Sequence, residues 1–242
     1  MLLSVDNVSK SFGGLMAVKQ LGLAVEEGEI LGLIGPNGSG KTTAFNLITG
    51  FLKPDSGKIE LGGKDITGLK PPSICASGVS RTFQLVKPFP HLTAMQNAMV
   101  GRLYGSSPAR TQGQAREECA GILDLVGLTG KHNALAKNLT LVERKRLELA
   151  RALAARPRLL LLDELMAGLN PTETDAAMQT IRAIRDSGIT IIMVEHIIKA
   201  VFGLCDRVIV LNAGEKIAEG SPQAIVGDQI VIEAYLGKVH RA

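Results

Sequence analysis

The chain has 242 residues, of which 45% are apolar and 21% charged, so it is long enough to bury a core and too apolar to be disordered. Aromatic residues make up only 3%, which excludes a surface that stacks the successive bases of a single nucleic-acid strand. The formal net charge of +4 suits an anionic ligand or membrane surface, but no stripe of Lys and Arg indicates a nucleic-acid partner.

The first sixty residues predict short strands separated by turns, at residues 2–8, 17–25 and 58–61. Glycine pairs supply the turns, Gly13-Gly14 and Gly62-Gly63. The charge at Asp6 comes too early for a secretory signal peptide. No apolar run approaches the ~20 residues that span a bilayer. We therefore expect a soluble chain, for which a membrane partner remains open.

A strand, a glycine-rich loop and a helix come next. Ile30–Ile34 is a short apolar run, and the residues after Lys41 predict a helix that Gly50 closes. The loop between them matches the pattern G-x-x-x-x-G-K-[ST]. It consists of Gly35, Pro36, Asn37, Gly38, Ser39, Gly40, Lys41, Thr42 and Thr43.

This loop predicts a site for ATP and Mg²⁺. Its glycines let main-chain N–H groups point inward around phosphate oxygens, at the positive end of the following helix. In this pattern Lys41 reaches the β- and γ-phosphates and the Thr42 hydroxyl ligates Mg²⁺. The alternative is a glycine-rich turn that binds nothing, and the strand and helix on either side argue against it. We expect ATP binding, followed by hydrolysis.

The middle of the chain predicts a helical insertion. Loops are marked by Pro88, Pro90, Gly105 and Pro108. Helical segments are predicted at about 93–103, at 114–126 and from about 140. In the last segment Leu147, Ala150, Leu153 and Ala154 fall on one face. We expect residues 85–156 to form an α-helical subdomain, within a single domain whose α/β core comprises residues 1–84 and 157–242.

The core elements then resume. Residues 159–162 form an apolar strand, and Asn170-Pro171-Thr172-Glu173 predicts a helix start from its cap residue, its Pro and its Glu. That helix should run to about Ser187 and stop at Gly188. Further strands are expected at Thr190–Val194, 208–211 and 216–218, and Ser221-Pro222 should cap a C-terminal helix. Apolar strands that alternate with helices predict an α/β fold with a mostly parallel sheet.

Three polar residues follow two of these strands. Asp163-Glu164 and His196 lie at the carboxyl ends, the edge where ligands of open α/β sheets bind. Asp163 would hold the Mg²⁺ shell, Glu164 would polarise the attacking water, and His196 would contact the γ-phosphate. The plainer interpretations are a solvent-exposed helix cap for the carboxylates and a structural role for the histidine.

The motif order resembles that of the ATP-binding subunits of ABC transporters, across essentially the whole chain. It comprises the glycine loop, Gln84, residues 139–143, residues 159–164 and His196. The chain is more closely similar to the subunits that energise branched-chain amino acid importers. The segments that carry this likeness are residues 12–15, 46–51, 81–84, 167–173 and 233–237.

The resemblance implies the P-loop NTPase fold of ABC ATPases, with an antiparallel β subdomain beside the mostly parallel core. It assigns adenine stacking to Phe12. It makes Gln84 a sensor of Mg²⁺ and the attacking water, Glu164 the general base and His196 the switch that holds the γ-phosphate. The signature motif would be Leu139, Thr140, Leu141, Val142 and Glu143, facing the ATP of a second subunit.

The signature departs from the usual Leu-Ser-Gly-Gly-Gln. Val142 replaces a glycine and adds a side chain where backbone should approach phosphate, whereas Thr140 keeps a hydroxyl. Leu165 and Ile197 also stand where Pro and Asp are usual. We therefore expect an asymmetric, head-to-tail pair with a different ATPase subunit, in which the site that uses Val142 is the slower one.

The implied partners are this second ATPase, two transmembrane permease subunits and, indirectly, a periplasmic or extracellular solute-binding protein, with the chain on the cytoplasmic face of the cell membrane. The alternatives are an exporter subunit for lipid or polysaccharide, a soluble non-transport ABC ATPase, and a regulatory subunit that binds ATP without cleaving it. The solute is not determined by this chain.

Overall fold

A computed structural model describes residues 1–84 and 87–236 of the chain. It divides into two compact units, one made of Met1–Pro71 with the described residues from Thr190 on, the other of Pro72–Ile189. The boundaries predicted at residues 84 and 157 remain a prediction about subdomains. Gly237, which belongs to a segment that carries the resemblance, lies outside the described residues.

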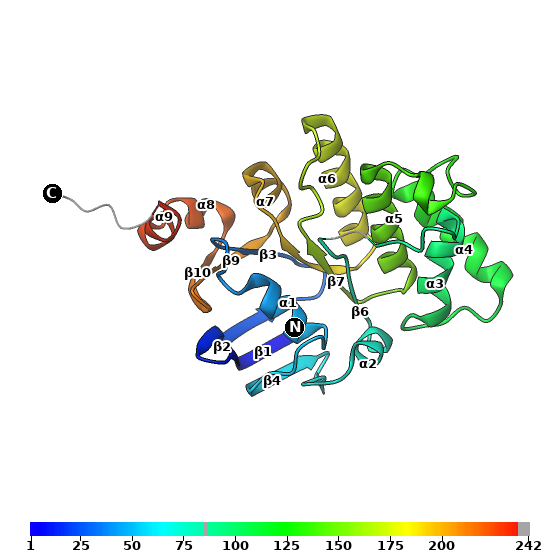
Figure 1. The fold of residues 1–242 in the computed structure, drawn as a ribbon. Coiled ribbons are helices and arrows are strands. Elements are labelled where there is room, and N and C mark those ends of the chain that lie inside the picture. Colours follow the sequence, from blue (N-terminus) through cyan, green and yellow to red (C-terminus); the bar gives the residue numbers. More distant parts are fainter. Residues whose placement is uncertain (85–86, 237–242) are drawn as a thin grey trace. The chain divides into compact units, whose positions relative to one another are not determined.

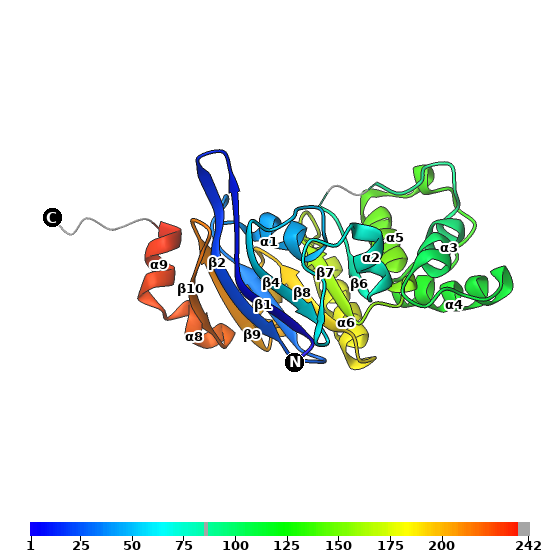
Figure 2. The same cartoon turned by 90° about the horizontal axis from the view of Figure 1, so that it is seen from below.

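The first unit contains an antiparallel sheet in the order β2-β1-β4-β5. Its strands are β1 (Leu3–Phe12), β2 (Leu15–Val25), β4 (Ser56–Leu61) and β5 (Lys64–Asp65). The predicted strands are confirmed, but β1 and β2 run further toward each other, as a hairpin whose tip projects in Figure 2. The sequence pattern missed this tip because its residues are mostly exposed and so lack an apolar alternation.

The parallel strands of the first unit surround β3 (Ile30–Ile34), which pairs with β8 (Thr190–Val194) on one side and β9 (Arg207–Asn212) on the other. The edge strand β10 (Glu215–Gly220) is antiparallel to β9. All five residues of β8 and the first four of β3 are buried, which is why both read as continuous apolar runs. Helices α1 (Lys41–Ile48) and α7 (Ile198–Leu204) belong to the same unit.

The C-terminal helix predicted after Ser221 is two helices, α8 (Pro222–Val226) and α9 (Gln229–Leu236), drawn in red in Figure 1. Ser221 caps the first one, as predicted. The break occurs at Gly227 and Asp228, where the Asp228 carboxylate accepts the Ile230 N–H at 2.8 Å and so caps the second helix.

The second unit contains the parallel pair β6 (Val79–Arg81) and β7 (Leu159–Asp163). It begins with the short helix α2 (Pro71–Ala76), most of which belongs to it. Neither α2 nor β6 was predicted, because six and three residues are too few to show a period. All of β7 is buried.

Four longer helices complete the second unit: α3 (Ala94–Tyr104), α4 (Gln112–Leu125), α5 (Leu141–Ala154) and α6 (Pro171–Asp186). A 3-10 turn at Ala136–Asn138 precedes α5. The predicted apolar face of α5 is buried, at Leu147, Ala150, Leu153 and Ala154. Capping boxes start α3, α5 and α6, and the one at Asn170 and Glu173 is the one that the sequence predicted. Among the described residues no helix is both long and apolar enough to cross a membrane.

Candidate functional site

The glycine-rich loop connects β3 to α1, and two of its glycines are required by its geometry. Gly35 has φ +151°, and a Cβ there would lie 2.1 Å from the Leu211 carbonyl oxygen. Gly40 has φ +106°, and a Cβ there would lie 2.6 Å from the Ala17 carbonyl oxygen. Since both obstacles are main chain, no side chain can rotate away, and only glycine fits either position.

The start of α1 is suited to an anion. Gly40 is its N-cap, no side chain caps it, and its first turn holds no acidic residue. The first-turn N–H groups therefore keep their capacity to bond phosphate oxygens at the positive end of the helix. Lys41 is only 7% exposed, and its side chain is directed back toward the loop. Its Nζ donates to the carbonyl oxygens of Gly35 at 2.8 Å and Pro36 at 2.9 Å. A cation and a set of amides are thus held together.

The turn between β9 and β10 supports this loop through a contact that the sequence did not predict. The Gly214 N–H donates to the Ser39 carbonyl at 3.0 Å, and the Lys19 N–H donates to the Gly214 carbonyl at 2.8 Å. Ala213 and Gly214 both have positive φ, 47° and 84°, which defines a tight turn between β9 and β10. The neighbouring Asn-Ala-Gly-Glu sequence carries a turn signal, but nothing local reveals that the turn touches the loop.

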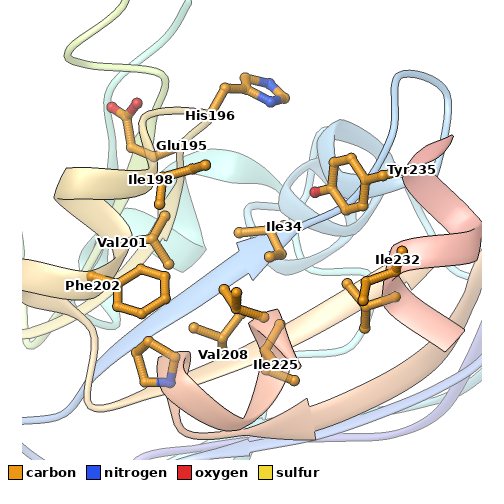
Figure 3. Close-up of a pocket in the computed structure, with 13 residues that line it drawn as sticks. Ile34, Glu195, His196, Ile198, Val201, Phe202, Val208, Ile225, Ile232 and Tyr235 are labelled. Atoms are coloured by element: carbon orange, nitrogen blue, oxygen red, sulfur yellow. The ribbon is translucent and has the colours of Figure 1, made fainter. Parts of the chain in front are cut away.

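His196 lies just after β8, as predicted, and its side chain is exposed. It lines a pocket of about 370 Å³ together with Ile34, the residue before the glycine loop, and Tyr235 of α9 (Figure 3). Burial raises the pKa of Tyr235, and the nearby Gly35 amide acts in the opposite direction. The other lining residues are almost all apolar, so this pocket does not suit a triphosphate, but it places His196 and α9 beside the start of the loop.

In the second unit, residues 81–84 form an ion pair and hydrogen bonds with Asp163 and Glu164, at the end of β7. Arg81 Nη2 lies 2.6 Å from Asp163 Oδ2, with both side chains about 5% exposed. The Asp163 N–H donates to the Thr82 hydroxyl at 3.2 Å. Gln84 donates from Nε2 to Glu164 Oε2 at 2.9 Å. The structure therefore brings three predicted residues of this unit together, and it adds the Arg81–Asp163 ion pair, which was not predicted.

Glu164 adopts a backbone conformation that costs energy outside glycine. Its φ is +50°, in the left-handed region. Its side chain is half-buried, whereas Asp163 directly before it is 6% exposed. The reversal at Glu164 ends β7 and turns the carboxylate toward Gln84. This local strain marks the position as a candidate for function.

The segment predicted as the signature motif precedes and opens α5. Thr140 is the N-cap, and its hydroxyl accepts the Glu143 N–H at 3.2 Å while Glu143 accepts the Thr140 N–H at 2.9 Å. The Thr140 N–H bond to the Glu143 carboxylate lowers the pKa of Glu143. Leu139 is buried, Leu141 is 63% exposed and Val142 is half-buried. The exposed Thr140 and Leu141 could face a partner.

Phe12, predicted to stack on adenine, ends β1 and is 47% exposed. The Lys10 ammonium lies 5.9 Å from the centre of its ring. Leu15 and Met16, across the hairpin turn, are also exposed, at 69% and 47%. A core role for Phe12 is therefore excluded, and its ring is open to a planar ligand.

Comparison with known proteins places this geometry in a family. A family model described as ABC transporter matches residues 18–167, and one described as branched-chain amino acid ATP-binding cassette transporter matches residues 215–241. The chain is 41% identical to the high-affinity branched-chain amino acid transport ATP-binding proteins BraF of Pseudomonas aeruginosa and LivG of Escherichia coli, over 98% of each chain. It is 32% identical, over 98% of each chain, to the lipopolysaccharide export system ATP-binding protein LptB of Haemophilus influenzae.

Among solved structures, the ADP conformation of MJ1267, an ATP-binding cassette of an ABC transporter, matches with a TM-score of 0.89 and 31% identity, over 98% of this chain and 99% of that one. A dimeric cassette, MJ0796, matches with a TM-score of 0.83 and 26% identity, over 91% and 99%. The glycine positions that no other residue fits and the uncapped start of α1 are suited to phosphate. The matches over nearly the full length of the chain are to ATP-binding proteins and cassettes, in agreement with that site. The chain belongs to the ABC transporter family, as one of its nucleotide-binding ATPase cassettes.

Proposed function

We propose that this chain is the ATP-hydrolysing subunit of an ABC importer for branched-chain amino acids or related small polar solutes. The observation that carries the proposal is the 41% identity over 98% of the chain to two branched-chain amino acid transport proteins. The second family match, at residues 215–241, supports it independently of the nucleotide-binding motifs. The chain would lie on the cytoplasmic face of the membrane, against two permease subunits served by a solute-binding protein.

The first unit would hold the nucleotide. Main-chain amides of residues 35–43 and the Lys41 ammonium would bind the phosphates, and the exposed Phe12 ring would stack on adenine. His196 would hold the γ-phosphate, a role that its place beside Ile34 supports. Each of these groups belongs to the same compact unit.

The second unit would supply the groups that act on water and metal. We propose Glu164 as the general base, and the Gln84 amide beside its carboxylate would help orient the attacking water. Mg²⁺, when bound, would neutralise charge on the phosphates. Mg²⁺ takes oxygen ligands, and each unit offers some of them. The second unit would supply the Gln84 amide oxygen and the Asp163 carboxylate, and the first unit would supply the Thr42 hydroxyl.

The segment Leu139–Glu143 would face the ATP of a second cassette in a head-to-tail pair. The exposure of Thr140 and Leu141 supports this role, and a dimeric cassette is among the similar structures. Val142 adds a side chain where a glycine is usual, so we propose a different ATPase as the partner, and the site that uses Val142 as the slower one.

Two experiments test the proposal. Calorimetry of the purified chain with Mg-ATP should show saturable binding, and its absence would refute the nucleotide site. Proteoliposomes that contain the assembled complex and its solute-binding protein should take up labelled leucine in an ATP-dependent way.

The similarity to LptB makes an export subunit the second candidate. Extraction of lipopolysaccharide from the bilayer without leucine uptake would favour that candidate instead.

A further inference from the structure

A buried carboxylate in the middle of α5 has no place in the proposed ATP chemistry. Glu148 is 4% exposed, and its Oε1 accepts the Phe83 main-chain N–H at 3.0 Å. The Arg151 guanidinium lies 3.9 Å from the same oxygen. Burying a carboxylate costs several kcal/mol unless its bonds compensate. A leucine or alanine would fill this helix position at no such cost, so the bond to Phe83 needs an explanation.

Phe83 is the residue before Gln84, so Glu148 holds the main chain that carries the Gln84 side chain. Gln84 in turn donates to Glu164 at 2.9 Å. The Arg81 guanidinium lies 5.1 Å from the centre of the Phe83 ring and bonds Asp163. Two hydrogen bonds therefore connect the Glu148 carboxylate to the proposed general base: one to the Phe83 N–H, and one from the neighbouring Gln84 side chain to Glu164.

Lys145 lies one turn before Glu148 on the same face of α5. It bonds the chain that follows Glu164, the other member of the Gln84–Glu164 pair. Its Nζ donates to the main-chain carbonyls of Leu165 at 3.1 Å and Ala167 at 2.6 Å. Leu165 directly follows Glu164, and Ala167 lies three residues after it. The left-handed backbone of Glu164 requires support from its surroundings. One helix thus bonds the chain before Gln84 and the chain after Glu164.

The same helix begins at the segment proposed to face the nucleotide of a second cassette. Thr140 caps α5, and Glu148 lies about two turns further along it. Glu148 and Lys145 belong to this one helix, so a shift of its first turn that carries the helix along would move the acceptor of the Phe83 N–H and the donor to the Leu165 carbonyl together.

We propose that Glu148 is a positioning residue that ties the signature helix to Gln84 and Glu164, so that engagement of the signature by the partner's nucleotide sets the geometry of this chain's own base. This inference rests on the proposed function. Glu148 touches neither nucleotide nor water in this scheme; it acts through the Phe83 main chain.

The test compares three variants of the full-length chain. Glu148→Ala removes the acceptor, Glu148→Gln keeps a carbonyl oxygen at the same place, and Leu147→Ala is the matched control. Leu147 is 1% exposed on the same helix, so its truncation weakens α5 without removing the bond to Phe83. Amide hydrogen exchange at Phe83 without nucleotide is the first measurement, and kcat and KM for ATP in the assembled complex are the second.

Glu148→Ala should raise the Phe83 exchange rate about tenfold and lower kcat by a similar factor, with KM for ATP nearly unchanged. Glu148→Gln should restore both, and Leu147→Ala should change neither. Unchanged Phe83 exchange in Glu148→Ala overturns the inference, and so does an equal loss of kcat in Leu147→Ala. Glu164→Gln is run in parallel: wild-type turnover in that variant would refute the proposed base, whereas the exchange experiment would still decide the role of Glu148.

Discussion

Replacing Glu148 by Gln should stabilise the protein at alkaline pH and leave it nearly unchanged at acidic pH. Burial raises the pKa of Glu148 from 4.5 to about 7, against the opposing effects of the Phe83 N–H and the cations Arg151, Lys145 and Arg81. Glutamine has the shape of the protonated acid and keeps an oxygen for the Phe83 N–H. The variant therefore isolates the cost of ionising this buried group.

The sign and size follow from linkage. Between pH 4.5 and 7 the folded chain holds a proton at Glu148 that the unfolded chain has released, so wild-type stability falls as pH rises through this window. This difference between the pKa of Glu148 in the unfolded and in the folded chain corresponds to about 3 kcal/mol of stability once pH exceeds 7. The stability of Glu148→Gln relative to wild type should thus rise from below about 1 kcal/mol near pH 5 to about 3 kcal/mol near pH 8.

Urea unfolding followed by circular dichroism at 222 nm, at pH 5 and pH 8, measures this difference. Glu118→Gln is the control, because the Arg102 guanidinium lowers the pKa of Glu118 to about 2. The stabilisation from Glu118 is present above its unfolded pKa and is lost only as pH falls toward 2, so the effect of that variant should be the same at pH 5 and pH 8. A Glu148→Gln effect that is equally independent of pH would refute the reasoning.

Three further outcomes are expected. Glu164→Gln should lower ATP turnover by about 10²–10⁴ while Mg-ATP binding by calorimetry survives, and unimpaired hydrolysis would remove Glu164 from its proposed role. Val142→Gly should raise turnover in the assembled complex, and no change there, with the partner's glycine loop shown to hydrolyse normally, would contradict the proposed asymmetry. Arg81→Ala should cost about 3–5 kcal/mol in urea unfolding, because it leaves the Asp163 carboxylate buried without its guanidinium partner; a loss below about 1 kcal/mol would show that the pair is not needed.

Short-range signals determined much of the fold. Ile30–Ile34 and Thr190–Val194 have the bounds predicted for them, because buried parallel strands are almost entirely apolar and rich in β-branched residues, a pattern visible within each segment. The start of α6 at Asn170 was equally clear, since the cap, the proline and the returning glutamate lie within four residues. The break between α8 and α9 was missed although Gly227 and Asp228 are stop and start signals, because the five residues of α8 are too few to show a helical period of their own.

By itself the sequence determined the phosphate-binding loop, whose glycines and lysine are contiguous and whose chemistry depends on main-chain groups of the same segment. Only the tertiary structure decided what supports that loop and the residues next to the proposed base: the Gly214 turn on Ser39, the Arg81 guanidinium on Asp163, and the Glu148 carboxylate on the Phe83 amide. These bonds join residues 65 to 175 positions apart, roughly, and no local pattern encodes such pairs. They form because a polar group that the fold removes from water takes a hydrogen-bonding partner from whatever segments the fold places beside it.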